Sequence, residues 1–438
     1  MSSTSELTGT EQATGLGQQE LARVRADFPI LTRQVNGKDL VYLDWGATSQ
    51  KPECVIDAEQ DFYLTTNAAV HRGAHALAEE ATAAFEDARA VVARLVGADD
   101  DEIVWTSNAT AAINLVAYGI SNASVGRGGP EAARFALAPG DELVVTELEH
   151  HANLVPWQEL AARTGAVLRF IPATDEGRLD LSVLDEVVTE RARVVAVTHA
   201  SNVTGAVTDL APIVARAHAV GAIVVLDACQ SVPNMPVDLH ALEVDFAAFS
   251  GHKMLGPTGI GVLYGRRELL AALPPVTTGG SMVEIVTMEA TTYAAPPQKF
   301  EAGTQMVAQT VGLRAAAQFL DDLGMDGVAE QERVLTQQLL DGLAAIPHVR
   351  VLGPLTATDR LGVVAFELAG VHPHDVGQVL DADGIAVRVG HHCAQPIHRR
   401  LGVASSTRAS VGIATTPADI DAFLHALAGV RAYFGVED

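Results

Sequence analysis

The sequence predicts an α/β protein built on a mainly parallel sheet. Between about residues 100 and 265, short apolar segments alternate with longer amphipathic ones, which is the pattern of successive β-α-β units. Hydrophobic residues make up 48% of the 438 residues and charged residues 19%, so the chain can bury large cores and is not disordered as a whole. This length corresponds to roughly two or three domains.

The first elements follow from spacing and end signals. Residues 1–20 are mostly polar and are expected to form a flexible tail. A helix is predicted over 79–96, where apolar residues recur at helical spacing and Gly97 ends the pattern. Seven strands are predicted at 102–105, 142–146, 166–171, 194–198, 223–227, 246–249 and 261–264. Helices are predicted between several of these strands, at 109–118, 155–164 and 209–219.

The C-terminal third predicts a second, smaller unit. The Gly- and Ala-rich residues 121–140 are expected to be a surface excursion, and the Pro-containing residues 265–310 an irregular crossover. Residues 309–345 are predicted to be helical, with strands at 362–368 and 385–389. We therefore expect a segment at 21–40 that packs with the small domain, a large domain at 41–300, and at 301–438 the crossover followed by a small α+β domain.

Composition excludes several classes of protein. The 54 Asp and Glu exceed the 29 Lys and Arg, and a net charge of −25 argues against nucleic acid as a partner. The three cysteines are odd in number and widely spaced, unlike a disulfide framework. Neither a signal-peptide pattern nor an apolar run of about 18 residues is visible, so we expect a cytoplasmic protein that binds no membrane.

Polar residues follow four of the predicted strands directly. Because ligands of open α/β sheets bind at the carboxyl ends of the strands, these residues are expected to meet at one rim. They are Glu149-His150-His151, Ser201-Asn202, Asp227 with Gln230, and Ser250-Gly251-His252-Lys253.

Lys253 is one of only four lysines, and it follows the apolar segment 245–249. In a cleft, desolvation lowers the pKa of an amine and makes it nucleophilic toward an aldehyde. Pyridoxal 5′-phosphate (PLP) needs such a lysine for its Schiff base and an acidic partner for its pyridinium nitrogen. Asp227 has the character of that partner, although a helix N-cap would use the same residue type.

Other segments suggest the remaining parts of a PLP site. Ser107-Asn108-Ala109-Thr110 precedes a helix whose N-terminus suits a phosphate, although many helices begin with such caps. Cys393 lies beside two histidines and near Arg388, a setting that favours the reactive thiolate. Arg408 has the geometry to bind a carboxylate.

The alternative function of the histidines is metal binding, at a site formed by 149–151, 391–393 and His398. Their spacing is neither i, i+4 nor Cys-x-x-Cys, so no metal is expected. An isolated histidine such as His150 is more often structural than catalytic.

From Val24 to Phe434 the chain resembles the SUF-type (group II) cysteine desulfurases, which are fold-type I PLP enzymes of aminotransferase class V. The Arg-x-Gly-His-His-Cys element at 388–393 separates this group from other class V enzymes. The other motifs that carry the resemblance are Ala26-Asp27-Phe28-Pro29, Tyr42-Leu43-Asp44, Val70-His71-Arg72-Gly73, Glu149-His150-His151-Ala152-Asn153, Asp227-Ala228-Cys229-Gln230, Ser250-Gly251-His252-Lys253 and Phe300-Glu301-Ala302-Gly303-Thr304.

The resemblance implies a role for each matching residue. Lys253 would form the Schiff base and take the substrate's α-proton, Asp227 would pair with the pyridinium nitrogen, and Gln230 would bond the ring hydroxyl. His150 would stack on the ring and take part in proton transfer. Ala109, Thr110, Ser250 and His252 would hold the phosphate, with Thr304 reaching in from the partner of a homodimer. Asn202 and Arg408 would bind the substrate carboxylate, and Cys393 would be the nucleophile.

The implied reaction converts L-cysteine to L-alanine and leaves a persulfide on Cys393. That sulfur would pass to an acceptor protein of the SUF system for iron–sulfur cluster assembly. Two related alternatives are a selenocysteine lyase and a specialised class V enzyme that supplies sulfur to a dedicated biosynthetic pathway. An alternative of another class is a catalytically silent scaffold, against which the retention of Lys253, Asp227 and Cys393 argues.

Several positions depart from the pattern of the resembling group. Asp44 is followed by Trp45-Gly46 in place of Ala-Ala, and the indole is expected to narrow the pocket. The other departures are Ala111, Gln305-Met306 after Thr304, and Ala414-Thr415-Thr416 after Arg408. They leave the PLP residues in place and bear on substrate range and loop closure.

Overall fold

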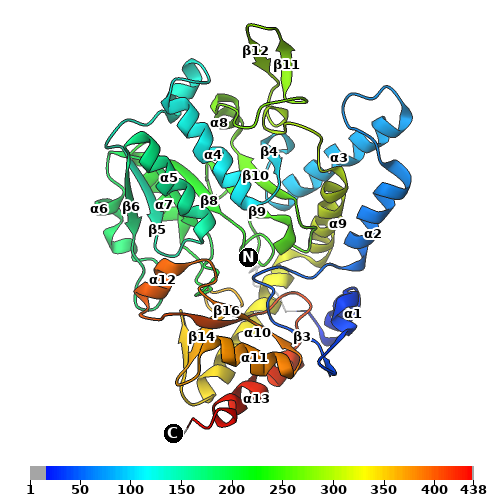
Figure 1. Cartoon of the computed structure of the whole chain (residues 1–438), viewed down its shortest axis with the longest axis vertical. Coiled ribbons are helices and arrows are strands. Elements are labelled where there is room, and N and C mark those ends of the chain that lie inside the picture. Colours follow the sequence, from blue (N-terminus) through cyan, green and yellow to red (C-terminus); the bar gives the residue numbers. More distant parts are fainter. Residues whose placement is uncertain (1–15, 437–438) are drawn as a thin grey trace, which may run out of the picture.

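The computed structural model describes residues 16–436, which form a larger and a smaller domain around two separate sheets (Figure 1). The larger sheet has seven strands in the order β4-β10-β9-β8-β7-β5-β6. Strands β5 to β9 are parallel to their neighbours among themselves, whereas β10 is antiparallel to both β9 and β4. All seven predicted strands therefore form, and the expected mainly parallel α/β sheet is confirmed. Their bounds are β4 (Ile103–Thr106), β5 (Glu142–Thr146), β6 (Val167–Ile171), β7 (Ala192–Thr198), β8 (Ile223–Asp227), β9 (Phe246–Ser250) and β10 (Gly261–Gly265).

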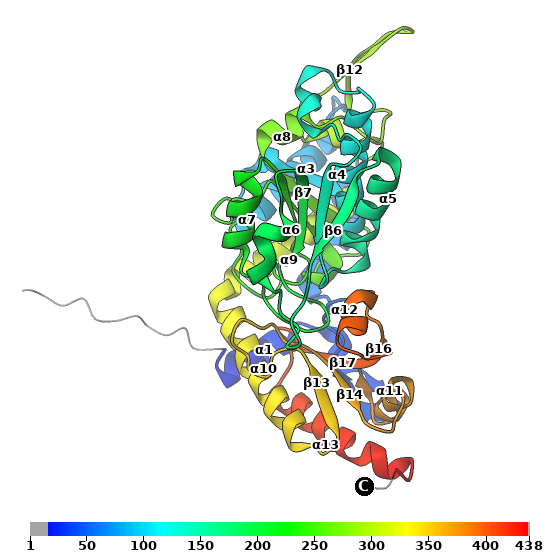
Figure 2. The same cartoon turned by 90° about the vertical axis from the view of Figure 1, so that its left-hand side faces the viewer.

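Helices cover both faces of the large sheet, which explains why its central strands are apolar on both sides. In β7, Val195 and Val197 pack into the core on one face, and Val194 and Ala196 into the core on the other. Figure 2 shows α7 and α5 on opposite sides of this sheet. On one face lie α2 (Glu53–Asp61), α3 (Ala76–Leu95), α7 (Leu210–Ala219) and α9 (Val307–Leu323); on the other lie α4 (Ala109–Ser124), α5 (Val155–Thr164) and α8 (Arg267–Ala272). The short α6 (Leu184–Val187) precedes β7.

The smaller domain is a four-stranded antiparallel sheet in the order β13-β14-β17-β16, packed against helices around a core of its own. The N-terminal segment contacts both domains: β3 (Val41–Tyr42) pairs with β15 (Ile385–Ala386) and Arg25 forms an ion pair with Asp419 at 2.8 Å, whereas Val24 and Phe28 lie in the core of the large domain. Its strands are β13 (Val349–Leu352), β14 (Val363–Leu368), β16 (Arg388–Gly390) and β17 (Ser406–Ser410). Its helices are α10 (Met325–Ala345), α11 (Pro373–Ala382), α12 (Gln395–Arg400) and α13 (Pro417–Tyr433).

The structure differs from the sequence predictions in five places. Residues 1–15 of the predicted tail lie outside the described residues, and α1 (Gln18–Ala26) begins inside the range expected to be tail. The segment 309–345 is helical as predicted but is divided into two helices, α9 and α10 (Met325–Ala345), because Gly324 lies between them with a φ of 78°. The predicted strand at 385–389 is split, since β15 and β16 belong to different sheets.

The two segments expected to be irregular also contain ordered structure. Helix α4 extends to Ser124, and a short 3-10 helix at Pro130–Phe135 buries Ala132 and Phe135 in the large core, so 121–140 is more than a surface excursion. Residues 265–310 contain α8 and a projecting hairpin of β11 (Val283–Val286) and β12 (Thr291–Tyr293). The alternation of polar and apolar residues in this hairpin is too short to stand out in the sequence. A second small hairpin pairs β1 (Gln34–Val35) with β2 (Lys38–Asp39).

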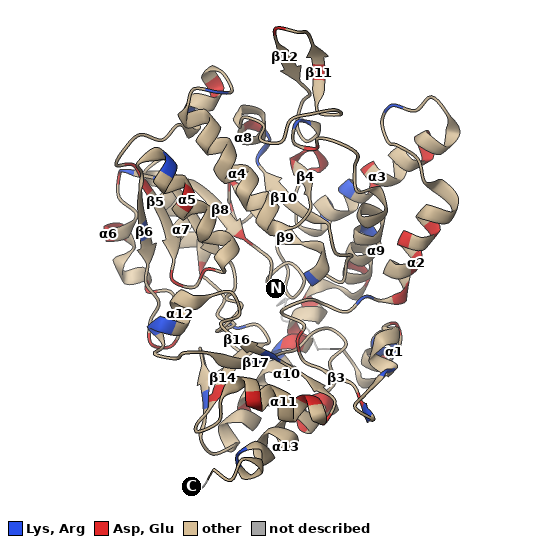
Figure 3. Cartoon of the chain, viewed as in Figure 1, with Lys and Arg blue, Asp and Glu red and all other residues tan. Residues whose placement is uncertain are grey.

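Figure 3 shows basic residues scattered among acidic ones over both domains. Within residues 16–436, no helix combines the length and the apolar character needed to cross a membrane.

Candidate active site

A cavity of about 450 Å³ lies at the carboxyl ends of β8 and β9, between the two domains. It brings together most of the residues that the sequence predicts to form the site. These are Ala109, Thr110, His150, Asn202, Asp227, Ser250, His252 and Lys253 from the large domain, and Cys393 and Arg408 from the small one. Gln230 and Thr304 do not line this cavity.

The ends of two central strands place the acid and the amine. Strand β8 ends at the buried Asp227, and β9 ends at Ser250, after which one 3-10 turn (Gly251–Lys253) presents Lys253. One oxygen of Asp227 accepts a hydrogen bond from the amide of Cys229 at 3.0 Å. No helix begins between β8 and β9, so the helix N-cap alternative for Asp227 does not apply.

The N-terminus of α4 forms the end of the cavity where an anion is favoured. Asn108 caps the helix by accepting from the amide of Ala111 at 2.9 Å, and Thr110 lies in its first turn. Ser250 Oγ accepts from the amide of Ala109 at 2.9 Å, which ties β9 to this helix end. The aligned N–H groups and the helix dipole favour a phosphate here.

Burial keeps the two cavity histidines of the large domain neutral near pH 7. His150 accepts from the amide of Ala152 through Nδ1 at 3.0 Å, which leaves the proton of the neutral ring on Nε2. Burial, together with the positive charge of Lys253, lowers the pKa of His150 to about 4. Burial also lowers the pKa of His252 to about 4, and its Nδ1 lies 3.2 Å from Thr48 Oγ1.

Glu149, next to His150, is a buried carboxyl that the sequence did not single out for a role of its own. It accepts hydrogen bonds from Thr146 Oγ1, the amide of Thr198 and Asn153 Nδ2, at 2.7–2.8 Å. Burial raises the pKa of Glu149 to about 8, while these three donors act in the opposite direction. Glu149 thus joins β5, β7 and the turn that carries His150.

The small domain supplies cationic groups at the other end of the cavity. Arg408, on β17, is 2% exposed and donates from Nη1 to the carbonyl of Asn202 at 3.0 Å. Its Nε is buried without a hydrogen-bond partner among the described residues. Asn202 uses its Nδ2 to donate to the carbonyl of His392 at 2.6 Å. Arg388 also lines the cavity, although the sequence predicted no binding role for it. Its position at the start of the 388–393 motif is the sequence feature that could have identified it.

Cys393 lies exposed in the loop that follows β16. It and His392 have φ values of 58° and 51°, a region that non-glycine residues seldom adopt. His392 and His398 both hydrogen-bond Ser406 Oγ through Nε2, at 2.9 Å. Among the described residues, the three-ligand cluster that the structure brings together is Asp99, Glu102 and His240, outside the cavity.

The remaining predicted residues lie elsewhere. Gln230 donates from Nε2 to the carbonyl of Gly46 at 2.9 Å. Thr304 lines a separate cavity of about 360 Å³ that shares Ser107 with the main one, and Gln305 and Met306 line that second cavity too.

The expected narrowing of the pocket by Trp45 is wrong. The indole is buried against Phe28 and Tyr42, with ring centroids 5.7 and 5.5 Å away, and does not line the main cavity. Only the small residues Gly46 and Ala47 of that segment reach it.

Residues 41–423 match the family model of class V aminotransferases. The chain belongs to this family. It is 55% identical over 420 residues to probable cysteine desulfurase 2 of Mycobacterium leprae, covering 95% of this chain and 98% of that protein. It is 51% identical to a probable cysteine desulfurase of Streptomyces coelicolor, covering 96% and 99% of the two chains.

Solved structures of class V aminotransferases agree with this placement. The cysteine desulfurase of Thermococcus onnurineus superposes with a TM-score of 0.85 at 38% identity, covering 92% of this chain and 96% of that one. The cysteine desulfurase CsdA of Escherichia coli superposes with a TM-score of 0.83 at 41% identity, covering 94% and 98%. A structure of C-DES with glycine linked to PLP superposes at 0.77 with 25% identity, covering 92% and 98%.

The cofactor of this class V enzyme is PLP, and the residues of the main cavity fit it. The cavity contains an amine at Lys253, a carboxylate at Asp227 and the N-terminus of α4, which are the kinds of group that would suit the aldehyde, the pyridinium nitrogen and the phosphate of PLP. The aldehyde, the pyridinium nitrogen and the phosphate of the cofactor therefore have complementary groups in one cavity, whereas Gln230, expected to bond the ring hydroxyl, does not line it.

Proposed function

We propose that this protein is a PLP-dependent cysteine desulfurase that converts L-cysteine to L-alanine. The observation that carries the proposal is the presence of Lys253, Cys393 and Arg408 in one cavity, contributed by two domains. A lysine with a carboxylate-binding arginine would serve many amino-acid reactions, whereas a cysteine thiol at the same cavity suits sulfur transfer.

The cavity residues divide between the cofactor and the substrate. The cofactor, when bound, supplies an electron sink that makes the α-proton of an amino acid acidic. Lys253 anchors the cofactor and then accepts that proton, and Asp227 keeps the pyridinium nitrogen protonated. Neutral His150 presents its Nε2 proton, and Gln230 is assigned to the ring hydroxyl once it leaves the carbonyl of Gly46. Ala109, Thr110, Ser250 and His252 are assigned to the phosphate.

Substrate binding and sulfur transfer use the small domain. Arg408, with Asn202, binds the substrate carboxylate and aims the substrate's thiol at Cys393. The Cys393 thiolate forms a bond to the substrate sulfur as the carbon–sulfur bond breaks, and protonation of the remaining carbons gives alanine. The sulfur stays on Cys393 as a persulfide.

Sulfur delivery follows from the exposure of Cys393, which a thiol of another protein can reach. We assign the persulfide to an acceptor of the SUF system in iron–sulfur cluster assembly, in the cytoplasm. Thr304 is assigned to the phosphate site of a partner subunit, because it lies in a cavity separate from its own site; this makes the protein a homodimer.

The test is a product assay with L-cysteine and a reductant. Wild type is expected to release alanine and sulfide in equal amounts and to carry a persulfide on Cys393 by mass spectrometry. Cys393→Ser should keep the yellow cofactor and lose at least about a hundredfold in rate, whereas Cys54→Ser, a change at another exposed cysteine, should retain the wild-type rate.

The same preparation decides between the alternatives. Equal rates of the Cys393→Ser variant and wild type would contradict the proposal. A selenocysteine rate far above the cysteine rate would favour the lyase, and a protein that stays colourless with added PLP would favour a silent scaffold.

A further inference from the structure

The carbonyl oxygen of His252 accepts hydrogen bonds from several donors that lie just before α2 in the chain. It accepts from the amide of Ser49 at 2.9 Å, from Ser49 Oγ at 3.0 Å and from Thr48 Oγ1 at 3.1 Å. The ammonium of Lys51 is the fourth donor, at 3.1 Å. A carbonyl oxygen has two lone pairs, so four donors are more than one peptide group can use fully. The peptide that precedes Lys253 is therefore tied to this segment.

Lys51 is the cation among these donors, and it bridges two carbonyls. Besides bonding the carbonyl of His252, its Nζ donates to the carbonyl of Ser49. The two hydroxyls of the set have other partners as well. Ser49 Oγ accepts from the amide of Leu255 at 2.8 Å, and Thr48 Oγ1 lies 3.2 Å from a ring nitrogen of His252. A charged donor makes a stronger hydrogen bond than a neutral one, so Lys51 is the strongest side-chain donor in the set.

Backbone carbonyls, rather than a carboxylate, surround the Lys51 ammonium. Lys51 is partly buried, and no carboxylate forms an ion pair with it among residues 16–436. Burial lowers the pKa of Lys51 to about 8, so the amine is still mostly protonated at pH 7. Taking a cation out of water without a counter-charge costs stability, and an apolar side chain would be more favourable here. The contact with the peptide before Lys253 therefore explains a cation at this place better than stability does.

That peptide decides where the Lys253 side chain begins. One 3-10 turn separates the end of β9 from Lys253. One side of the turn is bonded to the large sheet, because the amide of Gly251 donates to the carbonyl of Ile260 at 3.0 Å. The other side is bonded to Lys51 and its neighbours. A shift of the peptide moves the Lys253 amine with it, and a misplacement of about 1 Å can slow a reaction about a hundredfold.

We propose that Lys51 is a positioning residue, which fixes the peptide before Lys253 and so aligns the Lys253 amine with the α-carbon of the substrate. Lys51 does not line the main cavity, so it acts through the turn and not by contact with a ligand. The inference rests on the proposed function, because it takes Lys253 to be the group that accepts the α-proton.

The experiment follows the exchange of the α-proton of L-alanine for deuterium in D2O by NMR, with the holoenzyme at neutral pH. In this exchange Lys253 takes the α-proton, releases it to solvent and returns a deuteron, and Cys393 takes no part. Lys51→Met removes the donor and keeps a side chain of similar length. The exchange rate at saturating alanine should fall about tenfold, the size expected for one charge-assisted hydrogen bond. The alanine concentration that gives half the maximal rate should stay within about twofold of wild type.

Further variants separate positioning from other effects. Lys51→Arg keeps a cationic donor and should stay within about threefold of the wild-type rate, and Lys51→Gln, with a neutral donor, should lie between the other two variants. Lys38→Met removes an exposed lysine on β2 and should leave the rate unchanged. Lys51→Met should melt within about 4 °C of wild type, because the partly buried cation is lost together with its hydrogen bonds.

The outcomes distinguish this inference from the proposed function. A Lys51→Met exchange rate within about twofold of wild type would overturn the inference, as would equal rates of Lys51→Arg and Lys51→Met in proteins that melt alike. If Lys51→Met does not fold, the comparison of Lys51→Gln with Lys51→Arg decides in its place. Failure of wild type to form alanine from L-cysteine would overturn the proposed function instead, and α-proton exchange remains measurable in that case.

Discussion

The amide nitrogen of His151 donates a hydrogen bond to the carbonyl oxygen of Cys393, with 2.7 Å between the two atoms. This bond joins a turn of the large domain to the cysteine loop of the small domain. The loop needs such support, because both His392 and Cys393 have positive φ values, a conformation that costs about 1–3 kcal/mol per residue. Tertiary contacts, rather than local preference, hold Cys393 in place.

The His151 side chain is expected to position this loop. Its Nε2 accepts from the amide of Gln395 at 3.2 Å, and burial, followed by the charge of His391, lowers the pKa of His151 and favours the neutral, accepting ring. His151→Leu removes the acceptor, and we expect the rate of persulfide formation to fall about fivefold to tenfold for the loss of one hydrogen bond. Single-turnover mass spectrometry of Cys393 measures that rate.

Two further measurements test whether His151 positions the loop. The dissociation constant of PLP should stay within about twofold of wild type, since His151 does not line the cofactor cavity. His151→Gln keeps an acceptor and should recover part of the rate; a His151→Leu rate equal to wild type would contradict the positioning role.

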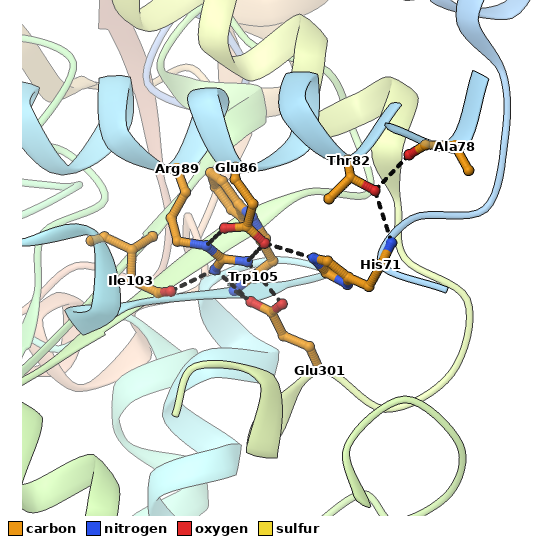
Figure 4. A network of polar contacts seen from close by, with 8 residues as sticks. All are labelled: His71, Ala78, Thr82, Glu86, Arg89, Ile103, Trp105 and Glu301. Carbon is orange, nitrogen blue, oxygen red and sulfur yellow. Dashed lines mark hydrogen bonds and ion pairs between the residues drawn. The ribbon is translucent and has the colours of Figure 1, made fainter. Parts of the chain in front are cut away.

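The buried pair of Arg89 and Glu301 is expected to be a major source of stability. Arg89 donates to both oxygens of Glu301 at 2.7 and 3.0 Å and to the carbonyl of Ile103 at 2.7 Å (Figure 4). Glu301 also accepts from the amide of Trp105 at 2.8 Å. Glu301→Leu removes the buried counter-charge of Arg89 and leaves only its ion pair with the more exposed Glu86, and we expect a loss of about 3–5 kcal/mol in the free energy of unfolding. Urea titration of the holoenzyme measures it.

The exposed pair of Arg333 and Glu330 provides the matched control. Two hydrogen bonds of 2.7 Å join these residues on the surface of α10. Glu330→Leu should change the free energy of unfolding by less than about 1 kcal/mol, because water screens the pair. Equal losses of unfolding free energy in the two variants would show that burial does not make the Arg89–Glu301 pair more important for stability than a surface pair.

His199 is expected to make the protein less stable in mild acid. It is buried, its Nδ1 has no hydrogen-bond partner among the described residues, and burial lowers its pKa to about 4. The unfolded chain takes up this proton near pH 6.5, so the contribution to stability is complete above that pH and is lost as pH falls toward 4. Within that window each pH unit removes about 1.4 kcal/mol.

His199→Phe removes this titration and fills a similar volume. Urea titrations of the wild type and the variant at pH 7, 6 and 5 give two slopes of stability against pH. The slope of the variant should be smaller, by the amount that corresponds to about one bound proton. Parallel slopes would mean that the pKa of His199 is the same in the folded and the unfolded protein. The other buried groups titrate in both proteins and cancel in this comparison.

Substitution by alanine is expected to change stability in opposite directions at two glycines, one packed against Trp45 and one with open space around it. A Cβ at Gly412 would lie 2.3 Å from the Trp45 ring, in a buried site, so Gly412→Ala is expected to cost about 1–3 kcal/mol. Gly429, inside α13, has no atom within 4 Å of its added Cβ, so Gly429→Ala should stabilise the protein by about 0.5–1 kcal/mol. Thermal unfolding of both variants measures the difference, and a stable Gly412→Ala protein would contradict the placement of the indole.

Strand periodicity and end signals made the architecture of the large domain predictable. The apolar segments at 142–146 and 223–227 coincide with β5 and β8, because a strand buried on both faces is apolar throughout. The polar residues that follow β8 and β9 meet in the cavity, since parallel strands end at the same edge. The helix break at Gly324 and the β11–β12 hairpin were not predicted. The sequence patterns at these two places are weak, and contacts with neighbouring elements determine the structure there.

By itself, the sequence determined the α/β class, the family and most of the residues that line the main cavity, because each depends on residue types at fixed spacings along the chain. Only the tertiary structure decided their contacts. The pairing of Asp44 with Arg408 joins residues 364 positions apart, Trp45 turns into the core rather than the pocket, and Gln230 bonds Gly46. Such contacts depend on how two separately packed domains meet, and that arrangement has no periodic signature along the chain.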